Sequence, residues 1–357
     1  MSEEVKRLQE AAALLGDWYR ASERKLPWRS IPTPYHVWLS EIMLQQTRIE
    51  AALPYYRRFL EAFPTVADLA GADDDRLMKL WEGLGYYSRA RNLKKAAERV
   101  MSDFGGSLPR SAEALRTLPG IGDYTAGAIA SIAYGLPAPA VDGNVLRVLS
   151  RLTADERDVL REGVKREATA ALREIYPTSP EDAAAMTQAL MELGEVVCIP
   201  NGAPHCDACP LRTLCEGRRL GIAERLPTRA KKPERTKEKR TVLLLFHGRT
   251  VALSRRGEDG LLSGMWELPS RDGHLTESEV EAALRAEGLT PVAIASGPRG
   301  KHVFSHREWH LTTYLVTLAS PPDGYVTATV EELADTYALP SAFRVPLAAV
   351  RERLEAL

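Results

Sequence analysis

Hydrophobic residues recur at helical spacing through the first two thirds of the chain. Between residues 3 and 226 they fall three and four positions apart, most clearly at 91–101 and 184–197, and prolines and glycines interrupt the pattern. Alternation of Val, Ile and Thr with polar residues is scarce in this region. The pattern therefore predicts a mainly helical domain over residues 1–226.

The pattern changes after residue 226. Residues 227–240 (PTRAKKPERTKEKR) are nearly free of apolar side chains and rich in Lys and Arg, which predicts a solvated basic linker; contact of this linker with phosphates is the alternative. Beyond it the spacing predicts three strands and one helix, at 241–246, 251–254, 309–317 and 277–287. We therefore expect a smaller α+β domain over residues 241–357.

Composition is that of a globular protein with two cores. The chain has 357 residues, of which 45% are hydrophobic and 27% charged. No run approaches the ~20 apolar residues of a membrane span, and the charged N-terminus lacks the apolar core of a signal peptide. We expect a cytoplasmic protein without membrane association, and a monomer, since nothing indicates an oligomer.

The four cysteines of the chain lie together in one short segment. They follow the spacing C-x7-C-x2-C-x5-C, at Cys198, Cys206, Cys209 and Cys215. A disulfide scaffold would spread its cysteines through a small secreted chain, so this cluster predicts one metal site in a loop over residues 198–215. Tetrahedral zinc and a [4Fe–4S] cluster both accept four thiolates, and spacing alone does not decide between them.

Residues 118–126 (LPGIGDYTA) contain a turn between two helical segments. Gly120 and Gly122 let the backbone turn tightly and direct N–H groups outward at the start of the next helix, where a phosphate binds well. A plain connection between helices is the alternative. The longer string LPGIGDYTAGAI is typical of the helix-hairpin-helix that grips DNA without reading its sequence.

Two carboxylates are candidates for acid and charge chemistry. Glu41 lies on a predicted helix among apolar neighbours, where desolvation would raise its pKa and favour the protonated form that a general acid needs. Asp142 precedes Gly143 and a helical segment. An exposed helix glutamate and a helix N-cap are the structural alternatives for these two residues. Breaking a glycosidic bond to a purine requires both an acid and a negative charge near the sugar.

Several strings together resemble the adenine DNA glycosylase family of the endonuclease III, or helix-hairpin-helix, superfamily. They occur in family order along nearly the whole chain, as LPWR (26–29), LSEIMLQQT (39–47), GLGYYSRARNL (83–93), LPGIGDYTAGAI (118–129), VDGNV (141–145) and QALMELG (188–194). The resemblance implies a helical glycosylase core that excises adenine opposite 8-oxoguanine or guanine in double-stranded DNA. It also implies one [4Fe–4S] cluster on the four cysteines, although the first interval is one residue longer than the family's usual C-x6-C.

The resemblance also assigns roles within the site. Glu41 would protonate adenine N7, and Asp142 would stabilise the oxocarbenium ion, with Tyr124 and Asn144 in support. The residues implied to enter the base stack beside the oxidised guanine are Gln46 and Tyr86. Those implied to line the pocket of the flipped adenine are Trp28, Arg29, Leu44 and Glu192.

Bifunctional relatives in the superfamily carry a lysine in the hairpin that forms a Schiff base with the sugar. Tyr124 occupies that position here, so we expect water to be the nucleophile and an abasic site to be the product. A related glycosylase with lyase activity is the second hypothesis. A catalytically idle DNA-binding scaffold with structural zinc is the third.

The C-terminal domain resembles the Nudix-like domain that this family uses to read 8-oxoguanine. GMWELP (264–269) matches a common Nudix string, whereas EVEAALRAEG (279–288) lacks the glutamate cluster with which a Nudix hydrolase holds magnesium, so we expect no pyrophosphatase activity. Phe304, Ser305 and His306 match the family's FSH loop. This match implies that Ser305 lies near the oxidised base.

Overall fold

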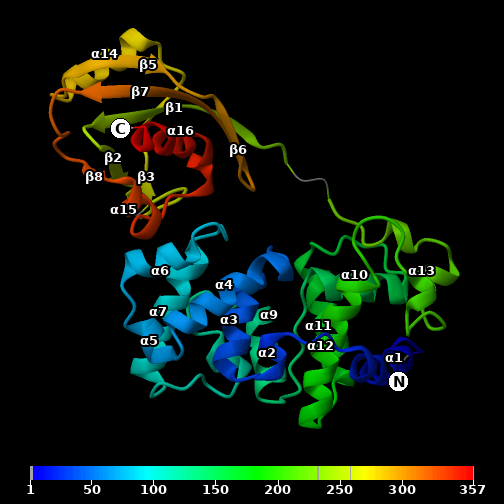
Figure 1. Ribbon diagram of the computed structural model, residues 1–357. Coiled ribbons are helices and arrows are strands. Elements are labelled where there is room, and N and C mark those ends of the chain that lie inside the picture. Colours follow the sequence, from blue (N-terminus) through cyan, green and yellow to red (C-terminus); the bar gives the residue numbers. More distant parts are fainter. Residues whose placement is uncertain (1–2, 231–232, 258, 357) are drawn as a thin grey trace. The chain divides into compact units, whose positions relative to one another are not determined.

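The computed structural model describes residues 3–230, 233–257 and 259–356, with side chains from residue 6 onward. These residues form two compact units, Met1–Gly71 with Arg91–Lys231 and Ala72–Ala90 with Lys232–Leu357. We call the first the helical unit and the second the sheet unit (Figure 1), and each is described by itself. The second unit differs from the expected domain because it also takes in residues 72–90.

Up to residue 225 the described chain is helical, as predicted. Its elements are α1 (Glu3–Ser22), α2 (Pro27–Ser30), α3 (Pro34–Leu44), α4 (Ile49–Ala62), α5 (Val66–Ala70), α6 (Asp74–Trp81), α7 (Ser88–Asp103), α8 (Ala112–Leu115), α9 (Asp123–Ala128), the π-helix η1 (Ile129–Ala133), α10 (Gly143–Thr153), α11 (Glu162–Ile175), α12 (Pro180–Val196), the 3-10 turn η2 (Cys206–Ala208), α13 (Glu216–Arg219) and the 3-10 turn η3 (Ala223–Arg225). No helix among the described residues is long and apolar enough to cross a membrane.

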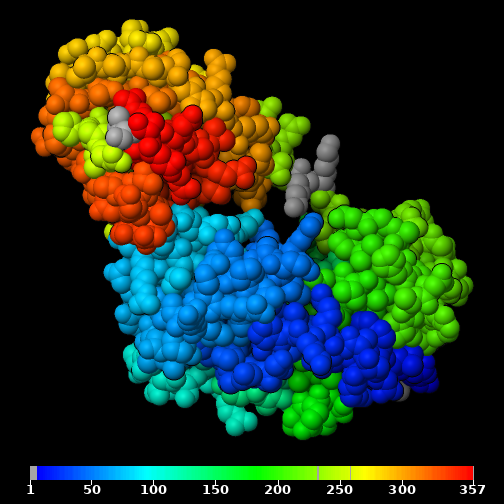
Figure 2. All heavy atoms as spheres, viewed as in Figure 1, coloured from blue at the N-terminus to red at the C-terminus, as the bar shows by residue number. Residues whose placement is uncertain are grey.

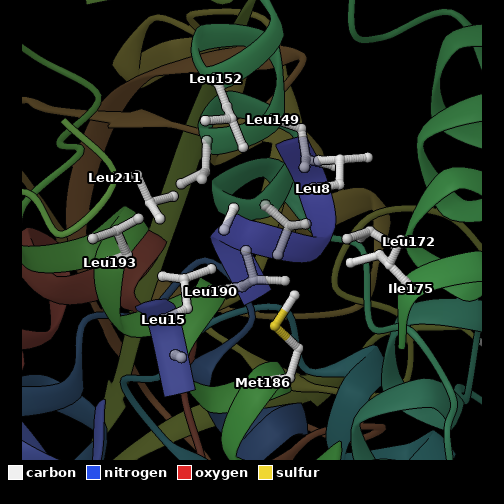
Figure 3. Close-up of a cluster of buried hydrophobic side chains, with 14 of the residues drawn as sticks. Leu8, Leu15, Leu149, Leu152, Leu172, Ile175, Met186, Leu190, Leu193 and Leu211 are labelled. Atoms are coloured by element: carbon white, nitrogen blue, oxygen red, sulfur yellow. The ribbon is translucent and has the colours of Figure 1, made fainter. Parts of the chain in front are cut away.

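The core of the helical unit forms where α1 and α10 pack on α12. Figures 1 and 2 show the blue N-terminal helix lying against green segments from much later in the chain. Leucines and a methionine from these helices interdigitate (Figure 3), and they include Leu8, Leu15, Leu149, Leu152, Met186, Leu190 and Leu193. Burial of these side chains fixes the helices that carry the candidate site.

Two close approaches of the backbone hold the site segments in place. A Cβ atom on Gly127 of α9 would lie 2.3 Å from the carbonyl oxygen of Pro139, in the segment that leads to Asp142. A Cβ atom on Gly194 of α12 would lie 2.7 Å from the Cβ atom of Asn144. Only glycine permits contacts this tight.

The sheet unit contains a mixed sheet between helices. Its elements after residue 235 are β1 (Thr236–His247), β2 (Thr250–Arg255), β3 (Trp266–Glu267), β4 (Ser270–Asp272), α14 (Glu277–Ala286), β5 (Pro291–Ser296), β6 (Gly300–Val303), β7 (Arg307–Leu318), β8 (Val326–Ala328), α15 (Val330–Asp335), the 3-10 turn η4 (Ser341–Phe343) and α16 (Arg344–Glu355). Strand β1 pairs parallel with β7, while the other pairs are antiparallel. The predicted strands and helix are confirmed.

Alternation along β1 explains why both faces of the sheet are covered. Val242, Leu244 and Phe246 pack toward the side of α15 and α16, whereas Leu243 and Leu245 pack toward α14. Successive side chains of a strand point to opposite faces, so an unbroken apolar run indicates burial on both. Figure 1 shows α16 and α14 on opposite sides of β1 and β7.

The predicted linker is shorter than expected. Strand β1 begins at Thr236, so the backbone of residues 236–240 pairs with β7, although the side chains of this segment are exposed or half-buried. The guanidinium of Arg240 lies 4.4 Å from the ring centroid of Trp309, and Trp309 Nε1 donates to Glu238 at 2.9 Å. The pairing with β7 and these side-chain contacts allow the charged residues 236–240 to form part of a strand, although their sequence pattern predicted a flexible linker. Lys231 and Lys232 lie outside the described residues.

Candidate active site

A cavity of about 800 Å³ opens in the helical unit between α2, α3, α9, α10 and α12. Most of the residues that the sequence proposed for catalysis or for the base pocket line it. These are Trp28, Arg29, Glu41, Leu44, Tyr124, Asp142 and Asn144. Gln46, which the resemblance assigns to the base stack, lines the cavity as well. Because residues more than one hundred positions apart converge here, the fold supports one reaction centre.

Glu41 is the buried acid of this cavity. Helix α3 begins at Pro34, with Thr33 accepting a cap hydrogen bond from the backbone N–H of His36, and it places Glu41 on a buried stretch with only 7% of its surface exposed. Burial raises the pKa of Glu41 to about 7; the negative charge of Asp142 adds to this, while a hydrogen bond from Tyr124 and the charge of Arg29 act against it. A carboxyl group in this range can donate a proton near neutral pH.

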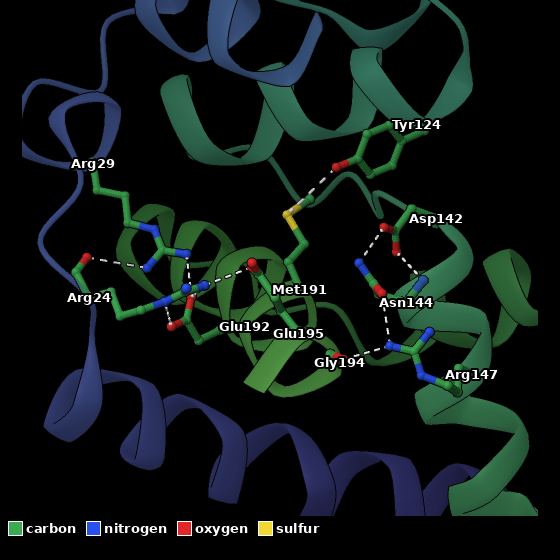
Figure 4. Close-up of polar contacts among 10 residues, drawn as sticks. All are labelled: Arg24, Arg29, Tyr124, Asp142, Asn144, Arg147, Met191, Glu192, Gly194 and Glu195. Atoms are coloured by element: carbon green, nitrogen blue, oxygen red, sulfur yellow. Dashed lines mark hydrogen bonds and ion pairs between the residues drawn. The ribbon is translucent and has the colours of Figure 1, made fainter. Parts of the chain in front are cut away.

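Tyr124 stands beside Glu41 on α9. Its hydroxyl lies 3.8 Å from the sulfur of Met191 (Figure 4) and hydrogen-bonds Glu41. Burial, followed by the charges of Glu41 and Asp142, raises the pKa of Tyr124 well above its ordinary value. Tyr124 therefore stays neutral and acts as a hydrogen-bond donor.

Asp142 is the N-cap of α10, and it also faces the cavity. One carboxylate oxygen accepts the backbone N–H groups of Asn144 at 2.9 Å and Val145 at 2.8 Å, and the other accepts the Asn144 amide at 3.0 Å. Burial raises the pKa of Asp142, whereas these donors and the charge of Arg147 act in the opposite direction. The structural and catalytic interpretations of Asp142 are thus compatible, because the cap bonds fix a carboxylate that borders the cavity.

A hydrogen-bond chain joins Asp142 to the cysteine segment. Arg147 donates to the Asn144 side-chain oxygen at 2.8 Å and to the Gly194 carbonyl (Figure 4). It also donates to the Cys198 carbonyl at 2.7 Å. Arg147 is only 2% exposed. The position of the cap residues therefore depends on the start of the cysteine loop.

Glu192 is not among the residues that line the cavity, although the resemblance assigned it to the adenine pocket. It is 2% exposed and bound by Arg29 at 2.6 Å and by Arg24, which also reaches Glu195 at 2.7 Å (Figure 4). These two cations lower the pKa of Glu192 against the effect of its burial. Glu192 thus positions Arg29, which does line the cavity.

The residues of α12 that line the cavity were missed by the sequence analysis. They are Gln188, Met191 and Glu195, spaced three and four positions apart on one helix face. This periodicity was available in the sequence. Glu192 lies four positions after Gln188 and three before Glu195, so periodicity places it on the same face, but Arg24 and Arg29 hold its carboxylate.

The predicted intercalating residues share an uncommon backbone conformation. Gln46 has φ +59° in the helical unit and Tyr86 has φ +47° in the sheet unit, although neither is glycine. Left-handed backbone at residues other than glycine stores strain and concentrates at functional sites. In the hairpin, Gly120 has φ +77°, and a Cβ atom there would lie 2.8 Å from that of Asn92. Gly122 is the N-cap of α9.

The FSH loop connects β6 to β7 in the sheet unit. Phe304 packs edge-on against Trp309 at 4.9 Å between ring centroids, and its backbone N–H donates to the Arg307 carbonyl at 2.8 Å. Ser305 and His306 are exposed at the tip. The Ser305 hydroxyl lies 2.9 Å from the Tyr86 hydroxyl, so the structure brings these two predicted contacts of the oxidised base together.

The four cysteines are free and partly buried. Cys198, Cys206 and Cys215 are all near enough to Cys209 for their charges to act on it. Arg151 donates to Cys198 Sγ at 3.2 Å, and Cys215 Sγ donates to the Arg151 carbonyl at 3.2 Å. Within the described residues, no group of three or more His, Cys, Asp or Glu side chains is arranged to hold a metal ion.

Comparisons with known proteins match both parts of the chain. The family of HhH-GPD superfamily base excision DNA repair proteins matches residues 39–174, and the NUDIX domain matches residues 241–349. These matches confirm the predicted fold class, a helix-hairpin-helix glycosylase core followed by a Nudix-like domain.

Individual curated proteins and solved structures that are similar to this chain are also DNA glycosylases. Adenine DNA glycosylase of Mus musculus is 34% identical over 365 residues, covering 85% of this chain and 70% of the mouse protein. The Homo sapiens enzyme of that name is 35% identical, and the match covers 76% of this chain and 59% of the human protein. A solved structure of a thermostable thymine-DNA glycosylase has 25% identity and a TM-score of 0.53, covering 60% of this chain and 98% of that one.

Proposed function

Since this chain belongs to the adenine DNA glycosylase family, we propose that it excises adenine paired with 8-oxoguanine or guanine in double-stranded DNA. The protein is a DNA glycosylase of base excision repair, and DNA is its partner. The observation that carries the proposal is one cavity in which a buried carboxyl group with a pKa of about 7 is accompanied by a second, capped carboxylate.

The carboxyl groups of Glu41 and Asp142 have different roles in the proposed reaction. A flipped adenine enters the cavity, whose volume of about 800 Å³ exceeds the need of one nucleoside. Glu41 donates its proton to adenine N7, which makes the base a better leaving group. Asp142, held by the Asn144 and Val145 donors, places negative charge near the sugar cation as the bond breaks.

We infer that the nucleophile is water and that the backbone of the DNA stays intact. A Schiff-base mechanism needs an amine within reach of the sugar. Among the described residues that line the cavity there is no lysine, and Tyr124 holds the hairpin position. The product is then an abasic site.

We propose that exposed side chains recognise the base paired with adenine. Tyr86 and Gln46, both with left-handed backbone, are proposed to enter the base stack, and Ser305 to contact the oxidised guanine. The hairpin glycines would present backbone N–H groups to a phosphate. These contacts offset the few kcal/mol that base flipping costs.

We propose that the four cysteines hold one [4Fe–4S] cluster. The donor set fits, because four thiols lie in one loop, none forms a disulfide, and Arg151 supplies a hydrogen bond to sulfur. The cluster would fix the loop that supports Arg147.

The decisive experiment compares three duplexes that carry A opposite 8-oxoguanine, A opposite G, and T opposite G. We expect base release from the first two and none from the third, with no adduct trapped by borohydride. Release of thymine, or a covalent protein–DNA adduct, would favour a glycosylase with lyase activity. Iron with visible absorbance in the purified protein is expected; colourless protein containing zinc would contradict the cluster.

A further inference from the structure

Helix α6 is attached to the C-terminal part of the sheet unit by a cation that serves three acceptors. Lys79 Nζ donates to the backbone carbonyls of Leu333 at 3.0 Å and Tyr337 at 3.2 Å, and to Glu82 at 2.7 Å. The Lys79 side chain is 17% exposed. A partly buried ammonium group with all three of its protons donated is a specific attachment, unlike an isolated surface ion pair.

Two carboxylates complete the attachment. Glu82 accepts the backbone N–H of Leu339 at 2.8 Å on the oxygen that Lys79 does not use. At the other end of α6, Asp75 accepts Trp266 Nε1 at 3.1 Å. We call Asp75, Lys79 and Glu82 the α6 latch. These contacts join residues 72–90 to segments more than 180 positions later in the chain.

The segment directly after the latch carries Tyr86 and is held by hydrogen bonds to its backbone carbonyls. Trp81 Nε1 donates to the Gly85 carbonyl at 3.2 Å, and Arg89 donates to the carbonyls of Leu84 and Gly85 at 3.2 Å. The Arg89 guanidinium lies 5.5 Å from the Tyr86 ring centroid. A displacement of α6 would therefore be transmitted to Tyr86 and not absorbed by the loop.

The contact between Tyr86 and Ser305 is too weak to hold these segments together. It is one hydrogen bond of 2.9 Å between two exposed side chains, and such a bond contributes about 1 kcal/mol. The latch contributes several bonds that are better shielded from water. Hence the latch fixes the distance between Tyr86 and Ser305. Their hydrogen bond is a consequence of that distance and not its cause.

We propose that Lys79 and Glu82 are positioning residues for recognition of the base opposite adenine. This inference rests on the proposed function. By holding Tyr86 beside Ser305, the latch makes one composite surface from residues far apart in sequence, and that surface distinguishes 8-oxoguanine from guanine. None of the three latch residues lines the cavity that holds Glu41, so adenine excision opposite guanine does not depend on the latch.

The test is Lys79→Met, which keeps the aliphatic stem and removes the three donors. We expect the rate of adenine release opposite 8-oxoguanine, divided by the rate opposite guanine, to fall about threefold to tenfold, which is the range of one hydrogen bond. The rate of adenine release should fall on the duplex with 8-oxoguanine opposite adenine, and not on the duplex with guanine. Arg285→Met is the matched control, because it removes the exposed pair with Glu281 on α14 and should leave the ratio unchanged.

A double-mutant cycle identifies the route of the effect. If the latch acts through the Tyr86–Ser305 contact, Lys79→Met combined with Ser305→Ala should cost no more discrimination than Ser305→Ala alone. Full additivity of the two losses would overturn the inference. Glu82→Gln is the milder second variant, since its amide oxygen still accepts from Leu339 while the charge that pairs with Lys79 is gone; it should lower the ratio in the same direction.

Failure of the latch and failure of the function give different results. If the wild-type protein releases no adenine from either duplex, the proposed function itself is wrong. If the wild-type protein discriminates between the duplexes and the folded Lys79→Met and Glu82→Gln variants discriminate equally well, only the proposal about the latch is wrong. Equal losses on both duplexes would also overturn it, because they indicate a general structural role.

Discussion

Glu41→Gln should inactivate the enzyme and at the same time stabilise its fold at alkaline pH. Folding raises the pKa of Glu41 from 4.5 to about 7, chiefly by burial. The difference of about 2.5 units corresponds to about 3 kcal/mol, since one unit is about 1.4 kcal/mol. The glutamine has nearly the same shape and never ionises, so it avoids the cost of burying a charge.

The sign of the effect follows from proton linkage. A carboxyl group whose pKa is raised by folding adds stability that is fully present below pH 4.5 and lost as pH rises through about 7. Relative to the Glu41→Gln variant, the wild type should therefore lose about 3 kcal/mol between about pH 4.5 and about pH 8.5. For a unit of this size that difference shifts the melting temperature by roughly 5–10 °C.

The assay is circular dichroism melting of both proteins at the two pH values. Glu61→Gln, an exposed position on α4, is the control and should follow the wild type at both. A melting difference between wild type and Glu41→Gln that is the same at both pH values would refute the assignment of a raised pKa. Retained adenine release in Glu41→Gln would refute its role as the acid.

Three further substitutions test the surroundings of the acid. Asp142→Asn keeps an acceptor at the N-cap but removes the charge, so adenine release should fall about a hundredfold or more, while the melting temperature changes little. Tyr124→Phe removes a hydrogen bond that lowers the pKa of Glu41, so in a pH–rate profile the alkaline limb should move to higher pH; an unmoved limb would contradict that bond. Gly127→Ala places a Cβ atom 2.3 Å from the Pro139 carbonyl oxygen and should destabilise the helical unit by about 2 kcal/mol in denaturant unfolding; a neutral result would mean that the segment shifts freely.

Short sequence strings predicted much of the reaction centre because each combines a reactive residue with its local scaffold. Glu41 sits in an apolar helix, and Asp142 directly precedes the helix that it caps. Their convergence in one cavity could not follow from either string alone. It depends on tight packing at Gly127 and Gly194, which only the three-dimensional structure reveals.

Other features depended on partners that are distant in sequence. Glu192 faces two arginines from the N-terminal region, while Gln188 takes the cavity face of the same helix. Thr236 begins a strand because β7 is available to pair with it, although residues 236–240 read as a tether. The grouping of residues 72–90 with the sheet unit depends on side-chain contacts such as those of Lys79, for which no local pattern exists.

The pH dependence of kcat/KM for adenine release opposite 8-oxoguanine tests the central chemistry most directly, because it reports the ionisations of the free enzyme. With a neutral Glu41 as proton donor, the constant should fall about tenfold per pH unit above about 7. A constant that stays level, or rises, up to about pH 9 would contradict proton donation by this residue.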